Sequence, residues 1–232
     1  MSTAEAARIA NLREAQNKAI AMFKEIEETL IRPGVSDKTL SAEIAALGKE
    51  RHALETHWHK RIVRSGPNTL AAYKDNPPDR VIEEDDIVVV DLGPVFERWE
   101  ADFGRTFVLG GDPRKLAVRD ALEPTWLAVR DRWRARPGMT GAELFAIAKE
   151  AGEAQGRWTW GADIAGHIVG SFPHERIPQD MMPLYIAAGN TTSMRTVGKD
   201  GHMRQWILEI YLHDKEGQFG GFFEQLLTVD DD

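Results

Sequence analysis

Apolar side chains recur at helical spacing in the first part of the chain. Within residues 4–30 they fall every three or four positions, as one face of an α-helix requires: Ile9, Leu12, Ala15, Ala19, Phe23, Ile26 and Leu30. The Pro33-Gly34 pair then predicts a turn. Ser36 supplies a side-chain oxygen suited to a helix N-terminus, so a second helix is expected through about residue 52.

The pattern repeats further along. Residues 113–134 carry a second apolar stripe, although Pro124 is expected to kink or interrupt that helix: Val118, Leu122, Trp126, Val129 and Trp133. The segment RPGVSDKTL at 32–40 is similar to RPGMTGAEL at 136–144, and each of the two segments lies between two helical stretches. This echo predicts a duplicated unit with a pseudo-twofold axis and a site between the halves. The alternative is that Pro-Gly-X-Ser/Thr is simply a common signal for the start of a helix.

Strands are predicted elsewhere. Residues 57–73 have the pattern of a strand, a Gly-Pro-Asn turn and further extended chain. IVVVDLG at 87–93 and RTFVLG at 105–110 are rich in β-forming residues and predict two more strands. After residue 157 short strands and turns are expected. Long helices together with strand hairpins indicate an α+β fold.

Bulk composition narrows the possible functions. The chain has 232 residues, of which 42% are hydrophobic, enough for one large or two small domains with a proper core. No stretch approaches the roughly 18 apolar residues that span a membrane, and no signal-peptide pattern opens the chain, so a cytoplasmic protein is expected. The net charge of −8 weighs against nucleic acid as a partner. With no cysteine, any metal must be held by nitrogen and oxygen ligands.

Five polar side chains stand in or beside the apolar runs. They are Asp91, Asp102, His167, Glu209 and Glu224. Burying a carboxylate is costly unless a cation or hydrogen bonds compensate, and two facing carboxylates repel unless a cation lies between them. Each residue alone could be a capping, turn or solvent-facing residue. Together, four carboxylates and one imidazole form a suitable ligand set for two divalent metal ions.

The order Asp, Asp, His, Glu, Glu resembles that of the pita-bread metallopeptidases, which include methionine aminopeptidase, Xaa-Pro aminopeptidase and creatinase. The resemblance covers most of the chain and rests on these segments: IRPGVSDKTL, RIVRSGPNT, DLG with ADFGRTFVLG, GHIVGSFPHE, EIYL and FFEQLLTV. It implies an α+β pita-bread fold of duplicated α-β units around a curved antiparallel sheet. It also implies that residues 1–232 form a single catalytic domain without the extra N-terminal domain typical of creatinase.

The resemblance also implies how the ligands are shared. Asp91 would chelate one metal ion, and His167 and Glu209 would hold the other. Asp102 and Glu224 would bridge both ions. This set suits Mn, Fe, Co or Zn and does not choose among them.

Activity follows from the same resemblance. The family implies a dinuclear-metal hydrolase, most nearly an aminopeptidase of the Xaa-Pro type, in which a hydroxide between the ions attacks the peptide bond. Glu209 would accept a proton, and His174 would hydrogen-bond the substrate carbonyl or the developing oxyanion. A homodimer is also plausible from the family. The aromatic residues near the site could line an apolar pocket or belong to the core: Trp158, Trp160, Phe172, Trp206 and Tyr211.

The chain departs from the family pattern in two places. The aminopeptidases usually place a substrate-contacting histidine where this chain has Ala72 (Tyr73 if the match shifts by one), and His57 or His59 is a candidate substitute. The usual Glu-Pro-Gly is here Glu209-Ile210-Tyr211. These departures favour an alternative, a metalloenzyme acting on a small amide or C–N-containing metabolite. A further alternative is a non-catalytic binding module of the same fold.

Overall fold

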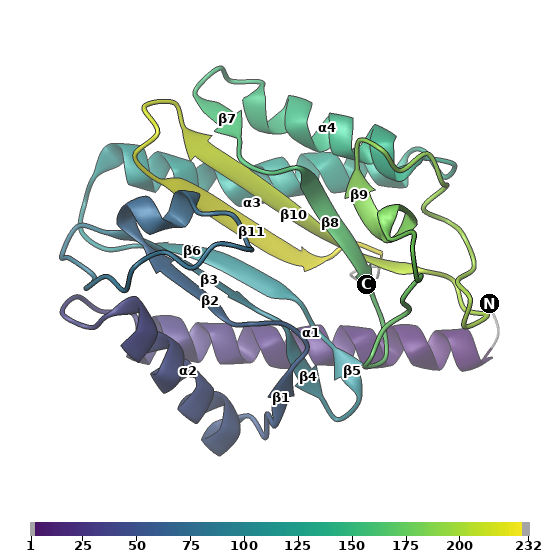
Figure 1. Cartoon of the computed structure of the whole chain (residues 1–232), viewed down its shortest axis with the longest axis horizontal. Coiled ribbons are helices and arrows are strands. Elements are labelled where there is room, and N and C mark those ends of the chain that lie inside the picture. Colours follow the sequence, from purple (N-terminus) through teal and green to yellow (C-terminus); the bar gives the residue numbers. More distant parts are fainter. Residues whose placement is uncertain (1–2, 229–232) are drawn as a thin grey trace.

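Four α-helices flank one large antiparallel sheet in the computed structural model, which describes residues 3–228 (Figure 1). They are α1 (Thr3–Thr29), α2 (Asp37–Arg51), α3 (Pro113–Arg134) and α4 (Gly141–Glu153). Helices α1 and α3 lie where the hydrophobic stripes predicted helices, and α2 and α4 follow the two Arg-Pro-Gly segments as expected. The combination of these helices with an antiparallel sheet confirms the α+β class.

The large sheet joins segments that are far apart in the sequence. Its strands run in the order β2 (Ile62–Ser65), β3 (Ile87–Leu92), β6 (Phe103–Val108), β11 (Gly220–Leu226), β10 (Gln205–Asp214), β8 (Ile164–Val169) and β9 (Tyr185–Ala187). A further strand, β7 (Trp158–Trp160), also pairs with β10. The middle of the sheet therefore brings β3 and β6 beside the C-terminal hairpin of β10 and β11.

Shorter elements complete the fold. A small sheet consists of β1 (Thr56–His57), β4 (Pro94–Phe96) and β5 (Trp99–Glu100). The 3-10 helix η1 (Gly66–Leu70) follows β2, and the 3-10 helix η2 (Met182–Leu184) precedes β9. The small sheet lies below the large one, close to α1 (Figure 1). Because β1 pairs with β4, which follows β3, the segment after β1 lies near the end of β3.

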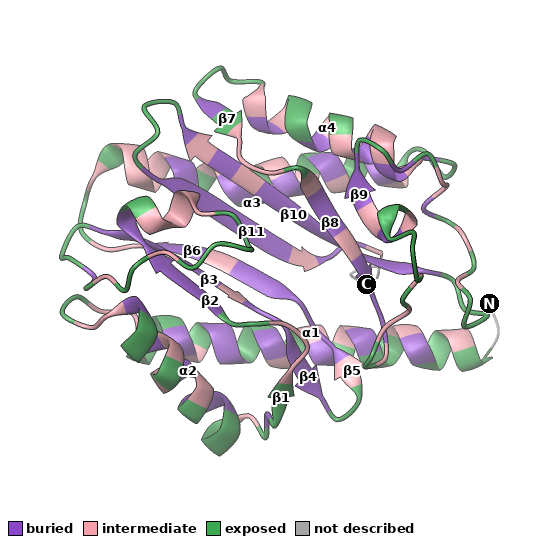
Figure 2. Ribbon diagram, viewed as in Figure 1, coloured by how far each residue is buried: buried purple, intermediate pink, exposed green. Residues whose placement is uncertain are grey.

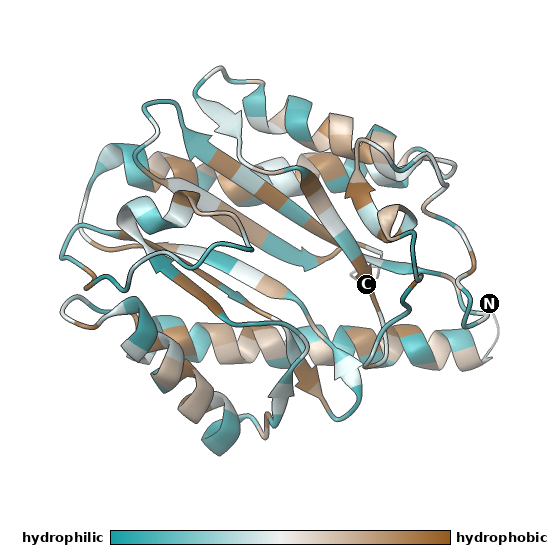
Figure 3. Ribbon diagram, in the orientation of Figure 1, coloured by the Kyte–Doolittle hydropathy of each residue, from teal (hydrophilic) through white to brown (hydrophobic). Residues whose placement is uncertain are grey.

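Two hydrophobic clusters pack the helices against the sheet. One joins α1 and α2 to β2, β3 and β6, and the other joins α3 and α4 to β8, β10 and β11. Most strand positions are buried, whereas exposed positions follow the outer helix faces and the loops (Figure 2). Around the helices, hydrophobic and hydrophilic positions alternate, as the buried and exposed positions do (Figure 3). Each half of the sheet therefore has its own pair of helices.

The repeated Arg-Pro-Gly segments begin equivalent helices. Ser36 caps α2 and Thr140 caps α4, each by accepting a backbone N–H in the first turn. Both capping residues also form an isolated antiparallel bridge, Ser36 with Val81 and Thr140 with Ser193. The predicted repetition of a long helix followed by a capped helix is confirmed.

The expected interruption at Pro124 does not occur. Helix α3 continues through this proline, although a proline lacks the N–H that would bond to the preceding turn. All five members of the predicted stripe are buried on one face of the helix. This packing against β10 and β11 stabilises the helix on both sides of Pro124.

Candidate metal centre

Three of the expected ligands lie in one row across the middle of the sheet. Asp91 on β3 pairs with Gly104 on β6, Gly104 pairs with Glu224 on β11, and Glu224 pairs with Glu209 on β10. Directly opposed residues point to the same face of an antiparallel sheet. The register therefore places Asp91, Glu224 and Glu209 on a common face. Gly104 adds no side chain to this row, and a Cβ there would lie 2.2 Å from the ring of Phe222.

Arg105 fastens two strands of this row together. Its guanidinium donates hydrogen bonds of 2.8 Å to the backbone oxygens of Gly104 and Glu224. It also lies 3.7 Å from the ring centroid of Phe103 and 3.8 Å from that of Phe223. Because this half-buried cation bonds to the backbone of Glu224, it fixes β11 against β6 at the position of the carboxylate.

The other two expected ligands approach the row from different segments. Asp102 lies just before β6, two positions from the Gly104 that pairs with Asp91. His167 lies on β8 after Gly166, whose φ of +131° favours glycine. A Cβ on Gly166 would lie 2.1 Å from the carbonyl oxygen of Ile207. The glycine before the histidine therefore allows β8 to approach β10 closely.

All five expected residues meet at one place. His167 Nε2 lies 3.0 Å from Asp102 Oδ2, 3.4 Å from Glu209 Oε1 and 3.9 Å from Glu224 Oε1. Asp102, Glu209 and Glu224 are each no more than 3% exposed. The solvent-facing alternative for Glu209 and Glu224 is therefore wrong.

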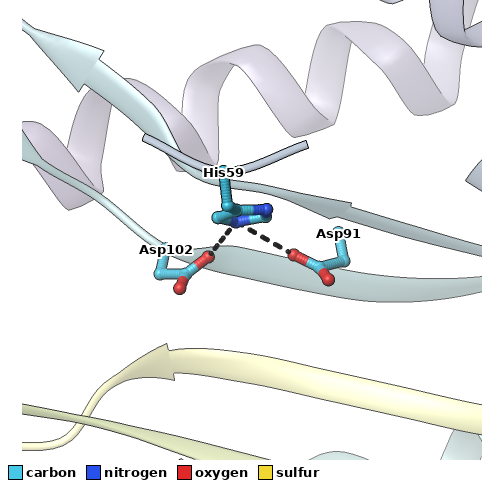
Figure 4. A group of neighbouring side chains, drawn as sticks. All are labelled: His59, Asp91 and Asp102. Atoms are coloured by element: carbon cyan, nitrogen blue, oxygen red, sulfur yellow. Dashed lines mark hydrogen bonds and ion pairs between the residues drawn. The ribbon is translucent and has the colours of Figure 1, made fainter. Parts of the chain in front are cut away.

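A sixth side chain, which was not among the expected ligands, joins the cluster. His59, in the segment after β1, places Nε2 3.1 Å from Asp102 Oδ1 and 3.5 Å from Asp91 Oδ1 (Figure 4). Its side chain is only 7% exposed. His59 had been considered as a substitute for the missing substrate-contacting histidine. Its Nε2 instead points at two carboxylates of the cluster.

The neighbouring tryptophan and a glycine of β3's DLG sequence position His59. Trp58 donates its backbone N–H to the carbonyl oxygen of Gly93 at 2.9 Å and its indole N–H to that of Ala101 at 3.2 Å. A Cβ on Gly93 would lie 2.3 Å from the ring of His59. The absence of a side chain at Gly93 is therefore what lets the two rings lie over the end of β3.

Charge is distributed unevenly over the cluster. Burial raises the pKa of Asp91 to about 7 and that of Glu224 well above its usual value. Although burial opposes charging of the rings, the nearby carboxylates raise the pKa of His59 to about 10 and that of His167 to about 9. Asp102 is also buried, yet its pKa is lowered because both imidazoles point at its oxygens. Asp102 is thus the carboxylate that most readily stays ionised.

The cluster fits divalent cations. Four carboxyl groups face two imidazoles, so even with both rings charged the fully ionised set carries two excess negative charges in a buried site. Within residues 3–228, Glu224 Oε2 is buried without a hydrogen-bond partner. Two groups can hold a metal by their spacing: His59, Asp91 and Asp102; and Asp102, His167 and Glu224. Buried carboxylates of this kind are compensated most simply by metal ions.

Glu209 has an additional partner on its own strand. Tyr211 donates its hydroxyl to Glu209 Oε2 at 2.5 Å. Burial raises the pKa of Glu209, whereas this hydrogen bond opposes the rise. Tyr211 stands in the place of the glycine in the family's Glu-Pro-Gly, so the departure adds a hydrogen-bond donor beside the cluster.

His174 lies at the edge of the cluster. Its ring stacks on that of His167 with 6.5 Å between centroids, and its Nδ1 lies 2.9 Å from Glu100 Oε2. Glu100 also accepts the backbone N–H groups of Gly170 and His174. The sequence did not single out Glu100, which lies in the polar run ERWEAD.

A cavity of about 530 Å³ opens onto these side chains, and a second of about 910 Å³ shares its wall. The wall common to both includes Asp91, Tyr73 and Tyr211. Of the other aromatic residues expected near the site, Trp160 lines the larger cavity, Trp158 and Trp206 are buried in the core, and Phe172 is 45% exposed. The pocket expectation therefore holds for Tyr211 and Trp160.

Comparison with known proteins identifies the architecture. The model of metallopeptidase family M24 matches residues 10–231. The chain belongs to this metallopeptidase family. The resemblance drawn from the ligand order is thereby confirmed, and it makes divalent metal the expected cofactor of the cluster.

Curated M24 relatives are longer than this chain. It is 31% identical over 161 residues to the Xaa-Pro dipeptidase of Pyrococcus furiosus, covering 67% of this chain and 43% of that enzyme. The Xaa-Pro dipeptidase of Pyrococcus horikoshii is also 31% identical, over 166 residues and 43% of its length. The chain therefore spans less than half the length of these relatives.

Solved structures share the pita-bread fold with this M24 chain. The dipeptidase from Pyrococcus horikoshii OT3 superposes with a TM-score of 0.75 at 22% identity, covering 99% of this chain and 58% of that one. Methionine aminopeptidase from Thermotoga maritima has a TM-score of 0.68 at 18% identity, and the match covers 99% of this chain and 98% of that one. At these identities the likeness concerns the fold, which confirms the predicted pita-bread architecture.

Among residues 3–228, no helix is long and apolar enough to cross a membrane.

Proposed function

We propose that the chain is a metallohydrolase that uses two divalent ions to cleave the N-terminal peptide bond of Xaa-Pro-type substrates. The observation that carries the proposal is the convergence of Asp91, Asp102, His167, Glu209 and Glu224 in one buried cluster beside a cavity. Family membership and the names of the Pyrococcus relatives support the same reaction.

The proposed ligand roles are those that the family resemblance implies. Asp91 would hold one ion, and His167 with Glu209 would hold the other. Asp102 and Glu224 would be shared by both ions; the two oxygens of Asp102 face His59 and His167 on opposite sides of the cluster. Bound there, the ions supply Lewis acidity and a water-derived nucleophile at neutral pH. Mn, Fe, Co and Zn all suit these ligands.

The remaining chemistry belongs to Glu209 and His174. Glu209 accepts a proton from the attacking water, and Tyr211 holds the carboxylate in position through its hydroxyl. Glu100 accepts a hydrogen bond from the Nδ1–H of His174 and so fixes the ring, and Nε2 in its protonated form donates to the substrate carbonyl oxygen. The two adjoining cavities provide the space for the substrate on either side of Tyr73 and Tyr211.

A panel of peptides tests the proposal. Purified protein loaded separately with Mn, Co, Fe and Zn is offered Xaa-Pro dipeptides, longer Xaa-Pro peptides and Met-initiated peptides. We expect about two equivalents of metal and release of the N-terminal residue from Xaa-Pro substrates. Asp102→Ala is the matched control: it removes the carboxylate that contacts both imidazoles and is expected to abolish metal loading and turnover. Failure of the wild type to bind any of the four metals would overturn the proposal.

A second candidate function rests on the position of the missing histidine. Ala72 and Tyr73 line the larger cavity, where the aminopeptidases of the family usually supply an imidazole to the substrate. His59 does not replace it, because its Nε2 faces Asp91 and Asp102. The alternative is hydrolysis of a small amide or C–N-containing metabolite by the same centre. Full metal loading with no turnover of the peptide panel, and turnover of small amides, would favour this candidate.

Three further expectations stay predictions. These are a cytoplasmic location, a homodimer and a single catalytic domain. The non-catalytic alternative predicts that the protein hydrolyses neither the peptides nor the small amides. Complete retention of the ligand cluster argues against that alternative, because a buried set of four carboxylates is costly to keep without a cation.

A further inference from the structure

His59 stands in the same relation to Asp102 as His167 does. His59 Nε2 lies 3.1 Å from Asp102 Oδ1, and His167 Nε2 lies 3.0 Å from Asp102 Oδ2. The two imidazoles therefore approach the two oxygens of one carboxylate. Each ring also faces a second carboxylate, Asp91 in the case of His59 and Glu209 in the case of His167.

The far nitrogen of each ring has the same kind of partner. His59 Nδ1 lies 2.7 Å from the carbonyl oxygen of Lys60, and His167 Nδ1 lies 2.8 Å from that of Ile168. A carbonyl oxygen only accepts, so Nδ1 must carry the proton in both rings. In the neutral ring, Nε2 is then left with a free lone pair. Metal-binding histidines usually have this arrangement, in which a carbonyl fixes the tautomer and the ring orientation.

We propose that His59 is a sixth protein ligand, which binds through Nε2 the ion that Asp91 and Asp102 hold. The inference rests on the proposed function, because it presupposes metal at this cluster. It also goes beyond that function, because the resemblance assigns no ligand to the segment HWHK. Each ion then has one imidazole ligand, His59 on one side and His167 on the other.

The spacing of the atoms suits coordination. Metal–nitrogen and metal–oxygen bonds of about 2.0–2.2 Å put neighbouring ligand atoms roughly 3.0–3.5 Å apart in octahedral or tetrahedral sites. His59 Nε2 lies 3.1 Å and 3.5 Å from the nearer oxygens of Asp102 and Asp91. The ring points down between these two carboxylates rather than past them (Figure 4). The three atoms are therefore spaced as three ligands of one ion.

The local structure holds His59 in this position. The ring of Trp58 lies edge-to-face against the rings of both His59 and His167, with centroids 4.5 Å and 5.1 Å away. Gly93 leaves room for the ring of His59, since a Cβ there would clash with it at 2.3 Å. An ordinary surface histidine requires none of these features. They position His59 as specifically as Gly166 positions His167.

An added imidazole changes which metals the site prefers. Imidazole nitrogen suits Zn, Cu, Fe and Ni, whereas sites made of carboxylate and water suit Mn and Mg. We therefore expect the site of His59, Asp91 and Asp102 to favour Zn over Mn. Replacing His59 should reduce this preference at one of the two sites.

Calorimetric titration of the full chain with Zn²⁺ and with Mn²⁺ tests the assignment. The variants are His59→Phe, which keeps a ring of similar size, and His59→Gln, which keeps a polar group. His57→Phe is the matched control in the same segment. We expect wild type and His57→Phe to bind two Zn²⁺ with equal affinity. In both His59 variants one Zn²⁺ should bind at least about tenfold more weakly while the second is unchanged, and Mn²⁺ affinity should fall less.

A spectroscopic readout on wild-type protein avoids dependence on the folding of the variants. Nitrogen hyperfine coupling on Mn²⁺ bound at both sites reports the number of imidazole ligands. We expect two coupled imidazoles, one for each ion. Coupling from only one imidazole with both sites filled would overturn the assignment of His59.

The titrations separate failure of this inference from failure of the proposed function. If wild type and both His59 variants bind two ions equally well, the ligand assignment is wrong and the metal centre stands. If wild type binds one ion and His59→Phe binds two, His59 substitutes for a metal ion and the assignment is also wrong. If wild type binds neither Zn²⁺ nor Mn²⁺ in the titrations, and neither Co nor Fe in the metal analysis, the proposed function itself fails.

Discussion

Glu100 fixes the imidazole of His174 at the edge of the cluster. His174 Nδ1 lies 2.9 Å from Oε2 of Glu100, a side chain that is 1% exposed. The same carboxylate accepts the backbone N–H of His174 at 3.0 Å and that of Gly170 at 3.1 Å. Because a carboxylate only accepts, Nδ1 carries the proton. Nε2 is therefore the nitrogen available to the cavity that His174 lines.

Replacing this carboxylate tests the role of His174. Glu100→Gln substitutes an amide that can donate to Nδ1 and so permits the wrong tautomer. We expect kcat on the substrate found with the peptide panel to fall about 10- to 100-fold, with a smaller change in KM and two metal ions still bound. The free energy of unfolding should fall by about 1–3 kcal/mol, because one of the buried hydrogen bonds loses its acceptor. Steady-state kinetics, metal analysis and urea unfolding measure the three effects.

Glu97→Gln is the control for this variant. Glu97 lies on the turn just before β5, its side chain is 80% exposed, and it contacts Lys18. It should leave kcat and the free energy of unfolding unchanged. Wild-type kcat in Glu100→Gln at full metal loading would show that His174 does not need this carboxylate.

Tyr211→Phe removes the hydroxyl that donates to Glu209. The hydrogen bond lowers the pKa of Glu209 against the effect of burial, so its loss makes the carboxylate harder to ionise. We expect metal affinity at neutral pH to fall about 10- to 100-fold and the free energy of unfolding to fall by about 1.5–3 kcal/mol. Tyr73→Phe, at a ring 53% exposed, is the control and should change neither. Equal metal affinity of Tyr211→Phe and wild type would contradict the role given to Tyr211.

The sequence predicted the helices and five members of the cluster for identifiable reasons. The helices have regular stripes and caps, and Ser36 and Thr140 mark two helix starts in the same way. In β10 the period of two puts Glu209 on the face opposite that of Trp206, Leu208, Ile210 and Leu212, which are buried against the α3 side. The order of ligands along the chain supplied the rest.

His59 and Glu100 could not be assigned in this way. The segment HWHK has no periodicity that marks a buried position, and the role of His59 depends on its approach to Gly93, 34 positions later in the chain. Glu100 lies in a polar run typical of a turn, yet β5 carries it into contact with the Gly170–His174 loop. Both residues act through tertiary contacts that no local pattern encodes.

The half-buried imidazole of His57 makes the free energy of unfolding depend on pH in the acid range. Burial, and then the charges of Arg61 and His59, lower the pKa of His57 to about 4, from 6.5. As the pH falls, the unfolded chain binds this proton before the folded protein does. The neutral ring therefore contributes stability above about pH 6.5, and this contribution is lost as the pH falls towards 4.

Urea unfolding in the presence of chelator tests this dependence without interference from metal. Between pH 7 and pH 4.5, wild type should lose more free energy of unfolding than His57→Gln, which has no imidazole to protonate. Parallel losses in the two proteins would show that His57 is not the group responsible.

Removal of metal should destabilise the protein because it leaves the buried carboxylates without their counter-charge. An ion present at 100 times its dissociation constant adds about 2.7 kcal/mol. A chain of this size gains about 2–4 °C in Tm for each kcal/mol, so one filled site corresponds to roughly 5–10 °C. Thermal unfolding of wild type with metal and with chelator should differ by at least this amount.

Asp102→Ala distinguishes specific binding from a general effect of divalent ions. Asp102 contacts both His59 and His167, so its loss removes a ligand from each proposed ion. Its Tm should therefore be the same with metal and with chelator, whereas Glu97→Gln should keep the full wild-type difference. A metal-dependent rise in the Tm of Asp102→Ala equal to that of wild type would place the stabilising ions elsewhere on the protein.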